Sequence, residues 1–180
     1  MSDYEIIRSA RRSIALNINP DGTVTVRAPL FMPEFLIKRF VENHKNWIEK
    51  QREKRKALEN VQKLTAQELK ALKERGKSVF RDRAEHFSPL LGVKYNAITV
   101  RSQKTRWGSC SGKGNLSFNC LLLLAPPEVL DSVVAHELCH LLEPNHSERF
   151  YALLLRVFPD YRRCRSWLNK NGPELTARLP

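Results

Sequence analysis

The sequence predicts an α+β fold in which a small antiparallel sheet packs on one apolar helix, preceded by a β-hairpin and long helices. Three observations predict it: alternating apolar residues over 6–28, helical spacing over 33–91, and short strand-like runs that precede an apolar segment at 127–142. A length of 180 residues accommodates one compact domain, or a domain with a small appendage. We therefore expect an appendage over 1–62 and a main domain over 63–180.

The N-terminal part is predicted to form a β-hairpin followed by a helix. Apolar residues alternate with polar or small ones over 6–28, and the Asn-Pro-Asp-Gly sequence at 19–22 is typical of a tight turn. The alternating residues are Ile14, Leu16, Ile18, Val24 and Val26. Pro33 suits the first turn of a helix, which apolar spacing extends to about residue 60.

The middle of the chain is predicted to hold a second long helix and three short strands. Thr65 and Glu68 have the spacing of a capping box, so this helix begins there and extends to about residues 90–91. Three runs then have the composition of strands, at 97–101, 106–110 and 115–119. The Ser-Gly-Lys-Gly sequence between the last two is typical of a hairpin turn.

Two helices are predicted in the C-terminal third. Pro127 suits the first turn of the first helix, whose apolar residues cover most of its circumference. The second is expected from about Ser147 to Asn169. Pro159 should interrupt it, because proline cannot donate a backbone amide proton.

The eleven residues from His136 to His146 carry the strongest chemical signal: His-Glu-Leu-Cys-His-Leu-Leu-Glu-Pro-Asn-His. On a helix, His136 and His140 are four residues apart, so both imidazoles lie on one face and can hold one ion. Glu137 lies beside them and can reach a water on that ion as a general base. This pattern predicts a catalytic zinc site.

A third histidine strengthens that prediction. Pro144 should end the helix just after Leu142 or Glu143, which lets the chain bring His146 back to the ion. Three protein ligands leave one tetrahedral position open, which is typical of catalytic rather than structural zinc. Single histidines on apolar helices usually pack in the core, but two of them with a carboxylate would be costly to bury without a cation.

The four cysteines are Cys110, Cys120, Cys139 and Cys164, and none forms a Cys-x-x-Cys pair. We expect them to stay reduced rather than to cross-link. Cys139 should point away from the ligand face and pack in the core. Cys110 remains an alternative candidate as a thiol near the cleft that binds or senses the metal.

No segment is predicted to span a membrane. The apolar run at 121–125 is too short for a bilayer and is followed by two prolines. The first five residues are polar and partly acidic, unlike a secretion signal. We therefore expect a cytoplasmic enzyme with no membrane partner.

The formal net charge of +12 is unevenly distributed. Residues 63–106 hold 11 lysines and arginines against 4 aspartates and glutamates, whereas 107–180 hold 8 against 7. The basic excess over 63–106 would favour a nucleic acid, an acidic protein or a phosphorylated ligand. A solvated basic surface without a dedicated partner explains the charge equally well.

Several motifs together resemble the YgjP-like metallopeptidase family. They are the sequences at 105–110, 115–119 and 124–128, the histidine motif with Ser147 and Phe150, and, in the hairpin, 11–12, 21–22 and 26–29. The resemblance covers nearly the whole chain. The ligand spacing also resembles the WLM proteases that clear protein crosslinked to DNA and, more loosely, SprT-like domains.

The resemblance implies a zincin-like catalytic domain over 63–180 and a peptidase mechanism. Zinc on the three histidines would lower the pKa of a bound water, and Glu137 would take its proton and pass it to the leaving amine. The strand at 106–110 resembles the edge strand to which an extended peptide adds. Arg106, Trp107, Gly108 and Tyr151 are the substrate-binding candidates. Arg106 or Tyr151 would stabilise the oxyanion, although Trp107 and Tyr151 also suit simple packing.

Two other zinc-protease types fit less well. A metzincin carries glycine where this chain has Glu143 and needs a downstream methionine turn, but both methionines precede the motif. A thermolysin-like enzyme takes its third ligand from a later glutamate, for which Glu148 and Glu174 are alternatives. His146 is closer to the expected spacing.

Two other functions stay open on the sequence alone. A metal-dependent nucleotide phosphohydrolase could use the same metal and the basic segment, but the chain has no Gly-rich phosphate loop and no carboxylate-rich magnesium site. A non-catalytic nucleic-acid-binding module with a structural metal would not require Glu137.

Overall fold

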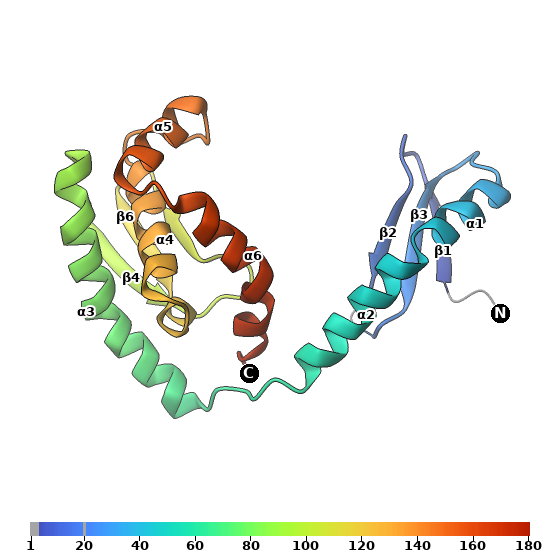
Figure 1. The fold of residues 1–180 in the computed structure, drawn as a ribbon, viewed down its shortest axis with the longest axis horizontal. Coiled ribbons are helices and arrows are strands. Elements are labelled where there is room, and N and C mark those ends of the chain that lie inside the picture. The colour runs from blue at the N-terminus through green and yellow to red at the C-terminus, as the bar shows by residue number, and fades with distance from the viewer. Residues whose placement is uncertain (1–3, 20) are drawn as a thin grey trace. The chain divides into compact units, whose positions relative to one another are not determined.

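The computed structural model describes residues 4–19 and 21–180, and the chain divides into two compact units, Met1–Asn60 and Val61–Pro180. Figure 1 shows strands and helices in both units, which confirms the predicted α+β class. We refer to them as the N-terminal unit and the main unit. Within the described residues, no helix is long and apolar enough to cross a membrane.

The N-terminal unit is a three-stranded sheet with two helices. The predicted hairpin is confirmed as β2 (Ala15–Ile18) and β3 (Val24–Pro29), which are antiparallel. A third strand that we did not predict, β1 (Tyr4–Ser9), pairs in parallel with the other side of β3. Val26 and Ala28 of β3 are fully buried against Ile37, which forms a small separate core.

The single helix predicted from Pro33 to about residue 60 is wrong in one respect, because it is two helices. These are α1 (Glu34–Asn43) and α2 (Lys45–Glu59), separated at His44, whose φ of −107° and ψ of 7° leave helical geometry. The His44 ring nitrogen Nδ1 lies 2.7 Å from the Phe40 carbonyl oxygen. This contact satisfies a carbonyl group at the end of α1.

The main unit begins with α3 (Ala66–Leu91), as predicted. The capping box is present: Thr65 accepts a hydrogen bond from the Glu68 amide, and the Glu68 carboxylate accepts one from the Thr65 amide at 2.8 Å. At the other end Gly92 adopts a φ of +67°, a left-handed conformation that suits glycine and ends the helix.

Three strands follow α3 and form a second sheet of order β4–β6–β5: β4 (Ala97–Arg101), β5 (Gly108–Cys110) and β6 (Asn115–Asn119). The prediction of an antiparallel sheet is wrong for one pairing, because β4 and β6 are parallel, while β5 and β6 are antiparallel. The chain reverses between β4 and β5 and again at the hairpin, so β6 returns in the direction of β4. This places β5 at the edge of the sheet.

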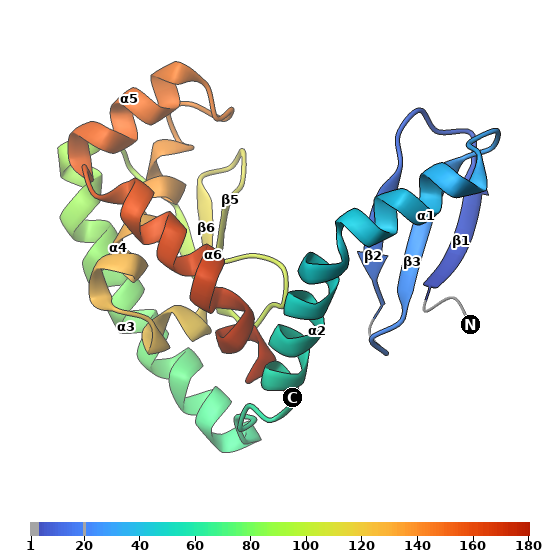
Figure 2. The same cartoon turned by 45° about the vertical axis from the view of Figure 1, so that its right-hand side comes forward.

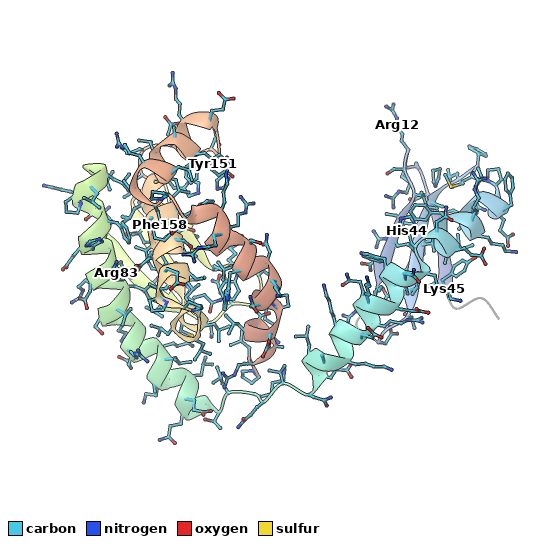
Figure 3. The ribbon with its side chains drawn as sticks, in the orientation of Figure 1. Arg12, His44, Lys45, Arg83, Tyr151 and Phe158 are labelled. Carbon is cyan, nitrogen blue, oxygen red and sulfur yellow. The ribbon has the colours of Figure 1, made fainter. Side chains whose placement is uncertain are left out.

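The central helix of the main unit is α4 (Pro127–Cys139), which follows the short 3₁₀ helix η1 (Cys120–Leu124). Figures 1 and 2 both show α4 between α3 and α6. Most of its side chains are buried, as its apolar sequence predicts. A partly buried ion pair connects it to α3: Nε of Arg83, the α3 residue labelled in Figure 3, donates to Asp131 at 2.6 Å.

Helix α4 ends earlier than predicted, at Cys139 rather than near Leu142 or Glu143. The amide groups of Leu142 and Glu143 both donate to the Cys139 carbonyl oxygen, each at 3.0 Å. The regular helix therefore gives way to a hydrogen-bonded turn before the chain reaches Pro144. The sequence pattern could not show this earlier end.

The predicted final helix is confirmed as interrupted at Pro159, giving α5 (Glu148–Val157) and α6 (Tyr161–Ala177). The last helix extends beyond the predicted end at Asn169 and includes Pro173. The Thr176 hydroxyl donates to the carbonyl oxygens of Gly172 and Pro173, at 3.1 and 3.0 Å. These bonds support the backbone around the proline.

Candidate metal centre

Three histidines of the main unit point their ring nitrogens at one another. His136 lies in the last turn of α4, His140 caps the end of that helix, and His146 lies in the loop before α5. The Nε2 atom of His136 lies 3.2 Å from that of His140 and 3.0 Å from that of His146. The structure thus brings together all three histidines that the sequence predicts as ligands.

The loop after α4 orients the His140 ring. Its Nδ1 atom lies 3.1 Å from the Glu143 carbonyl oxygen. Because a carbonyl oxygen can only accept a hydrogen bond, Nδ1 carries the proton and Nε2 presents its lone pair to the other histidines. A backbone contact of this kind is typical of a metal-binding histidine.

His136 is the most enclosed of the three. Its ring stacks on Tyr161 with centroids 5.5 Å apart and meets Phe150 edge-on at 4.8 Å. Burial is the main cause that lowers the pKa of His136 to about 3, with smaller contributions from His140, His146 and then Arg165. The ring is therefore neutral at physiological pH. Its Nδ1 is buried without a hydrogen-bond partner among the residues that the structure describes.

The separations of the ring nitrogens fit one small metal ion. Zinc binds histidine nitrogen at about 2.0–2.1 Å, so two nitrogens on a tetrahedral zinc lie about 3.3 Å apart. The observed separations of 3.0 and 3.2 Å are close to that value. Imidazole lone pairs that converge in this way would repel one another without a cation between them. Glu148 and Glu174, the alternatives for the third ligand, are not in this group.

The Glu137 carboxylate lies next to the histidines, buried under strand β5. Its residue is only 6% exposed, and burial raises the pKa of Glu137 to about 7. A cation on the neighbouring histidines would favour the ionised carboxylate. A Cβ atom added to Gly108 would lie 2.6 Å from both Cγ and Oε1 of Glu137. Only glycine leaves room for this carboxylate, so Gly108 shapes the site as well as lining it.

Two cavities open beside the histidines, one next to the loop that leads into β5 and the other along β5 itself. The first, of about 350 Å³, has walls from Trp107, Tyr151, Tyr161 and Arg165, and we name it the arginine cavity. The second, of about 380 Å³, is bordered by Ser109, Cys110, His140 and Pro144. Five residues line both: Arg106, Gly108, His136, Glu137 and His146. The histidines and Glu137 therefore form the middle of a continuous cleft.

The loop before β5 carries two of the predicted substrate-binding residues, Arg106 and Trp107, and hydrogen bonds from Asn119 hold its backbone. The buried Asn119 amide group donates to the carbonyl oxygens of Gln103 and Arg106, at 2.7 and 2.9 Å. The Arg106 side chain is exposed over the cleft. Trp107 lines the arginine cavity and also packs against α6, where a Cβ on Gly172 would lie 2.8 Å from its ring.

Tyr151 also lines the arginine cavity, and its hydroxyl contacts a residue that our sequence reasoning missed. Arg165 Nη1, on α6, donates to the Tyr151 hydroxyl at 3.2 Å. The helical spacing in the sequence does indicate that Arg165 lies on the inner face of its helix. It lies four residues after Tyr161 and three before Leu168, so it shares the helix face that these two inward-pointing residues define.

Cys110 lines the second cavity but is not in the three-histidine group. Burial, and to a smaller extent the Glu137 charge, raise the pKa of the Cys110 thiol. The protonated thiol is therefore the dominant form at neutral pH and is a weak metal ligand. Cys139 is fully buried, as predicted, and all four cysteines are free.

Comparison with known proteins gives one clear match. The model of the YgjP-like metallopeptidase domain matches residues 12–71 and 58–171, which is most of the chain. No curated protein matches.

Two solved structures resemble part of the chain. The metallopeptidase zymogen abylysin of Pyrococcus abyssi is 24% identical and has a TM-score of 0.46, and the match covers 51% of this chain and 93% of that one. The metallopeptidase zymogen jannalysin of Methanocaldococcus jannaschii is 20% identical with the same TM-score, covering 51% and 95%.

Proposed function

Because the chain belongs to the YgjP-like metallopeptidase family, we propose that it cleaves peptide bonds with zinc on His136, His140 and His146 and with Glu137 as the base. One observation carries the assignment of residues. The three Nε2 atoms converge beside a buried carboxylate at the centre of an open cleft. A structural metal site would need no carboxylate held in that place.

A zinc ion supplies Lewis-acid chemistry, because it lowers the pKa of water and polarises a carbonyl group. The Glu137 carboxylate accepts the proton of the attacking water and returns it to the leaving amine. The absence of a side chain at Gly108 leaves the space that this carboxylate occupies. Burial keeps competing bulk water away from it.

Strand β5 suits the binding of an extended peptide. It lies at the edge of the sheet, so one side pairs with β6 and the other can accept a further strand. The two cavities meet at the start of β5, where both are lined by Gly108, Glu137 and His136. A peptide added to β5 would bring a main-chain carbonyl to Glu137. Arg106, which lines both cavities, is then the candidate for stabilising the oxyanion.

Substitution of Glu137 by glutamine tests the mechanism, because the amide is nearly the same size but cannot accept the proton. We expect Glu137→Gln to keep one zinc per chain, measured by atomic absorption, and to lose about 10²- to 10⁴-fold in kcat/KM on denatured protein. Glu128→Gln, an exposed residue of the same helix, is the matched control and should keep both.

Full activity of Glu137→Gln with bound zinc would show that Glu137 is not the base. Hydrolysis of a nucleoside triphosphate by a parent protein that cuts no peptide would instead support phosphohydrolase activity. Both outcomes are read from the same preparations.

We also propose that the basic segment 63–106 associates with nucleic acid, so that the substrates are proteins bound to it. Some of its cations already have partners within the chain: Lys63, Lys77, Arg83 and Lys104. Others are exposed on α3 and near β4, including Lys70, Arg75, Arg81, Lys94 and Arg101. Stimulation of proteolysis by DNA that disappears as salt rises supports this proposal. Unchanged proteolysis in the presence of DNA contradicts it.

A further inference from the structure

The arginine cavity has an unbalanced charge. Two cations line it, Arg106 and Arg165, and its only carboxylate is Glu137, which the proposed function uses for proton transfer. The remaining walls are neutral, and three of them are aromatic: Trp107, Tyr151 and Tyr161. A cleft with low-dielectric walls and one sign of charge attracts groups of the opposite charge.

Arg165 is held at this cavity by neutral partners, the Tyr151 and Tyr161 hydroxyls. Its Nη1 donates to the Tyr151 hydroxyl at 3.2 Å, and no carboxylate of residues 4–19 or 21–180 lies within ion-pair distance of it. Other arginines of the main unit differ: Arg83 pairs with Asp131, and Arg163 pairs with Asp160. A guanidinium has five donors, so Arg165 keeps several for a ligand.

Arg106, which the proposed function assigns to the oxyanion, has five donors and so keeps some for a second group. Its side chain has no carboxylate partner in the described part of the chain, while its backbone is fixed by Asn119. It extends over the point where the two cavities meet. A group bound between Arg106 and Arg165 would therefore lie in the same cavity as Glu137 and next to the three histidines.

We propose that the arginine cavity binds a carboxylate of the peptide substrate, with Arg165 as the principal contact and Arg106 as the second. This inference rests on the proposed peptidase function and adds a substrate preference to it. Arginine binds carboxylates with two parallel hydrogen bonds, which fixes the orientation as well as the charge. A volume of about 350 Å³ accommodates an acidic side chain or a C-terminal residue with its free carboxylate.

Three matched peptides distinguish the two sources of that carboxylate. One carries aspartates and glutamates and has an amidated C-terminus, one replaces them by asparagine and glutamine, and one is neutral in its side chains with a free C-terminus. We expect the parent protein to cleave at least one carboxylate-bearing peptide about tenfold faster, in kcat/KM, than the neutral amidated peptide. The faster peptide identifies the source. Higher salt should reduce the ratio, because the arginines are partly exposed.

Variants of Arg165 then assign the preference to this residue. Arg165→Gln should lower the ratio of acidic to neutral cleavage about tenfold, Arg165→Lys should retain most of it, and Arg165→Glu should reverse it. Arg162→Gln is the matched control, because Arg162 is exposed on the same helix and does not line the cavity. It should leave both the activity and the ratio unchanged.

Binding provides a second readout that needs no turnover. The zinc-loaded Glu137→Gln variant, titrated with the same peptides, should bind the preferred one about tenfold more tightly, and adding Arg165→Gln should remove the difference.

Equal Kd values for all three peptides, or a ratio that Arg165→Gln leaves unchanged, would overturn the preference. Equal cleavage that still depends on Glu137 would overturn it while leaving the peptidase function intact. Absence of both cleavage and binding would overturn the two together.

Discussion

Gly108 faces the Glu137 side chain with no room for a methyl group, although nothing in the local sequence marks this glycine as special. Its conformation is ordinary, because only Gly22, Gly92 and Gly114 have a positive φ. The requirement comes from the packing of β5 over α4, which brings backbone and carboxylate together. Glycine is needed here for close approach rather than for chain flexibility.

Replacement of Gly108 by alanine should therefore displace the Glu137 carboxylate. We expect Gly108→Ala to lower kcat/KM at least tenfold while zinc content stays near one per chain, because the three atoms nearest to the added Cβ all belong to Glu137. Gly112→Ala is the control, since a Cβ at Gly112 meets nothing within 4 Å. Activity of Gly108→Ala equal to the parent would show that Glu137 does not depend on this fit.

Much of the candidate site could be predicted from residue spacing, because its ligands are local in the sequence. His136, His140 and His146 span eleven residues, and a helix followed by a turn is enough to bring them together. Arg165 comes from another helix, and its nearness depends on how α6 packs over α4. A pattern within one segment can show which face a residue lies on but not what that face meets.

Among the elements, those with a strong local signal matched the sequence best. The capping box and the glycine at the end of α3 fixed both ends of that helix. By contrast, the break between α1 and α2 lies at His44, where no proline or glycine marks it. The parallel pairing of β4 with β6 also has no local signal, since strand order depends on the path of the whole chain.

Removal of the Thr65 cap should destabilise the main unit at its first helix. Thr65→Ala should lower the free energy of unfolding by about 1 kcal/mol, measured by urea denaturation at neutral pH. The hydrogen bonds from the backbone and side chain of Thr65 also lower the pKa of Glu68 below 4.5 in the folded protein. Their stabilisation is thus present above pH 4.5 and is lost as the pH falls through the lower, folded-state pKa.

The difference between Thr65→Ala and the parent should therefore shrink when the pH is lowered below 4.5. Ser111→Ala, at the β5–β6 turn, provides a comparison that does not involve Glu68. A Thr65→Ala difference that stays constant from pH 7 to pH 3 would show that the Glu68 carboxylate plays no part in the cap.

At the scale of the whole molecule, the cores of the two units share no residue among those that the structure describes. The small core around Val26, Ala28 and Ile37 lies in the N-terminal unit, and the large one around α4 lies in the main unit. The proposed zinc ligands are all attached to the large core, at the end of α4 and the start of α5. A metal bound there stabilises the structure that holds its ligands, all of which belong to the main unit.

Removal of zinc should therefore act on the two units unequally. A ligand at about 100 times its Kd stabilises the folded state by about 2.7 kcal/mol, so a chelator should remove at least that much from the main unit.

Hydrogen exchange measured by mass spectrometry can locate the effect, because it reports opening segment by segment. We expect peptides from α4 and α5 to exchange faster after chelation, while those from β2, β3 and α1 keep their rates. His146→Ala should imitate the chelator. Equal acceleration in both units would show that the chain unfolds as one cooperative body and would contradict the predicted division into an appendage over 1–62 and a catalytic domain over 63–180.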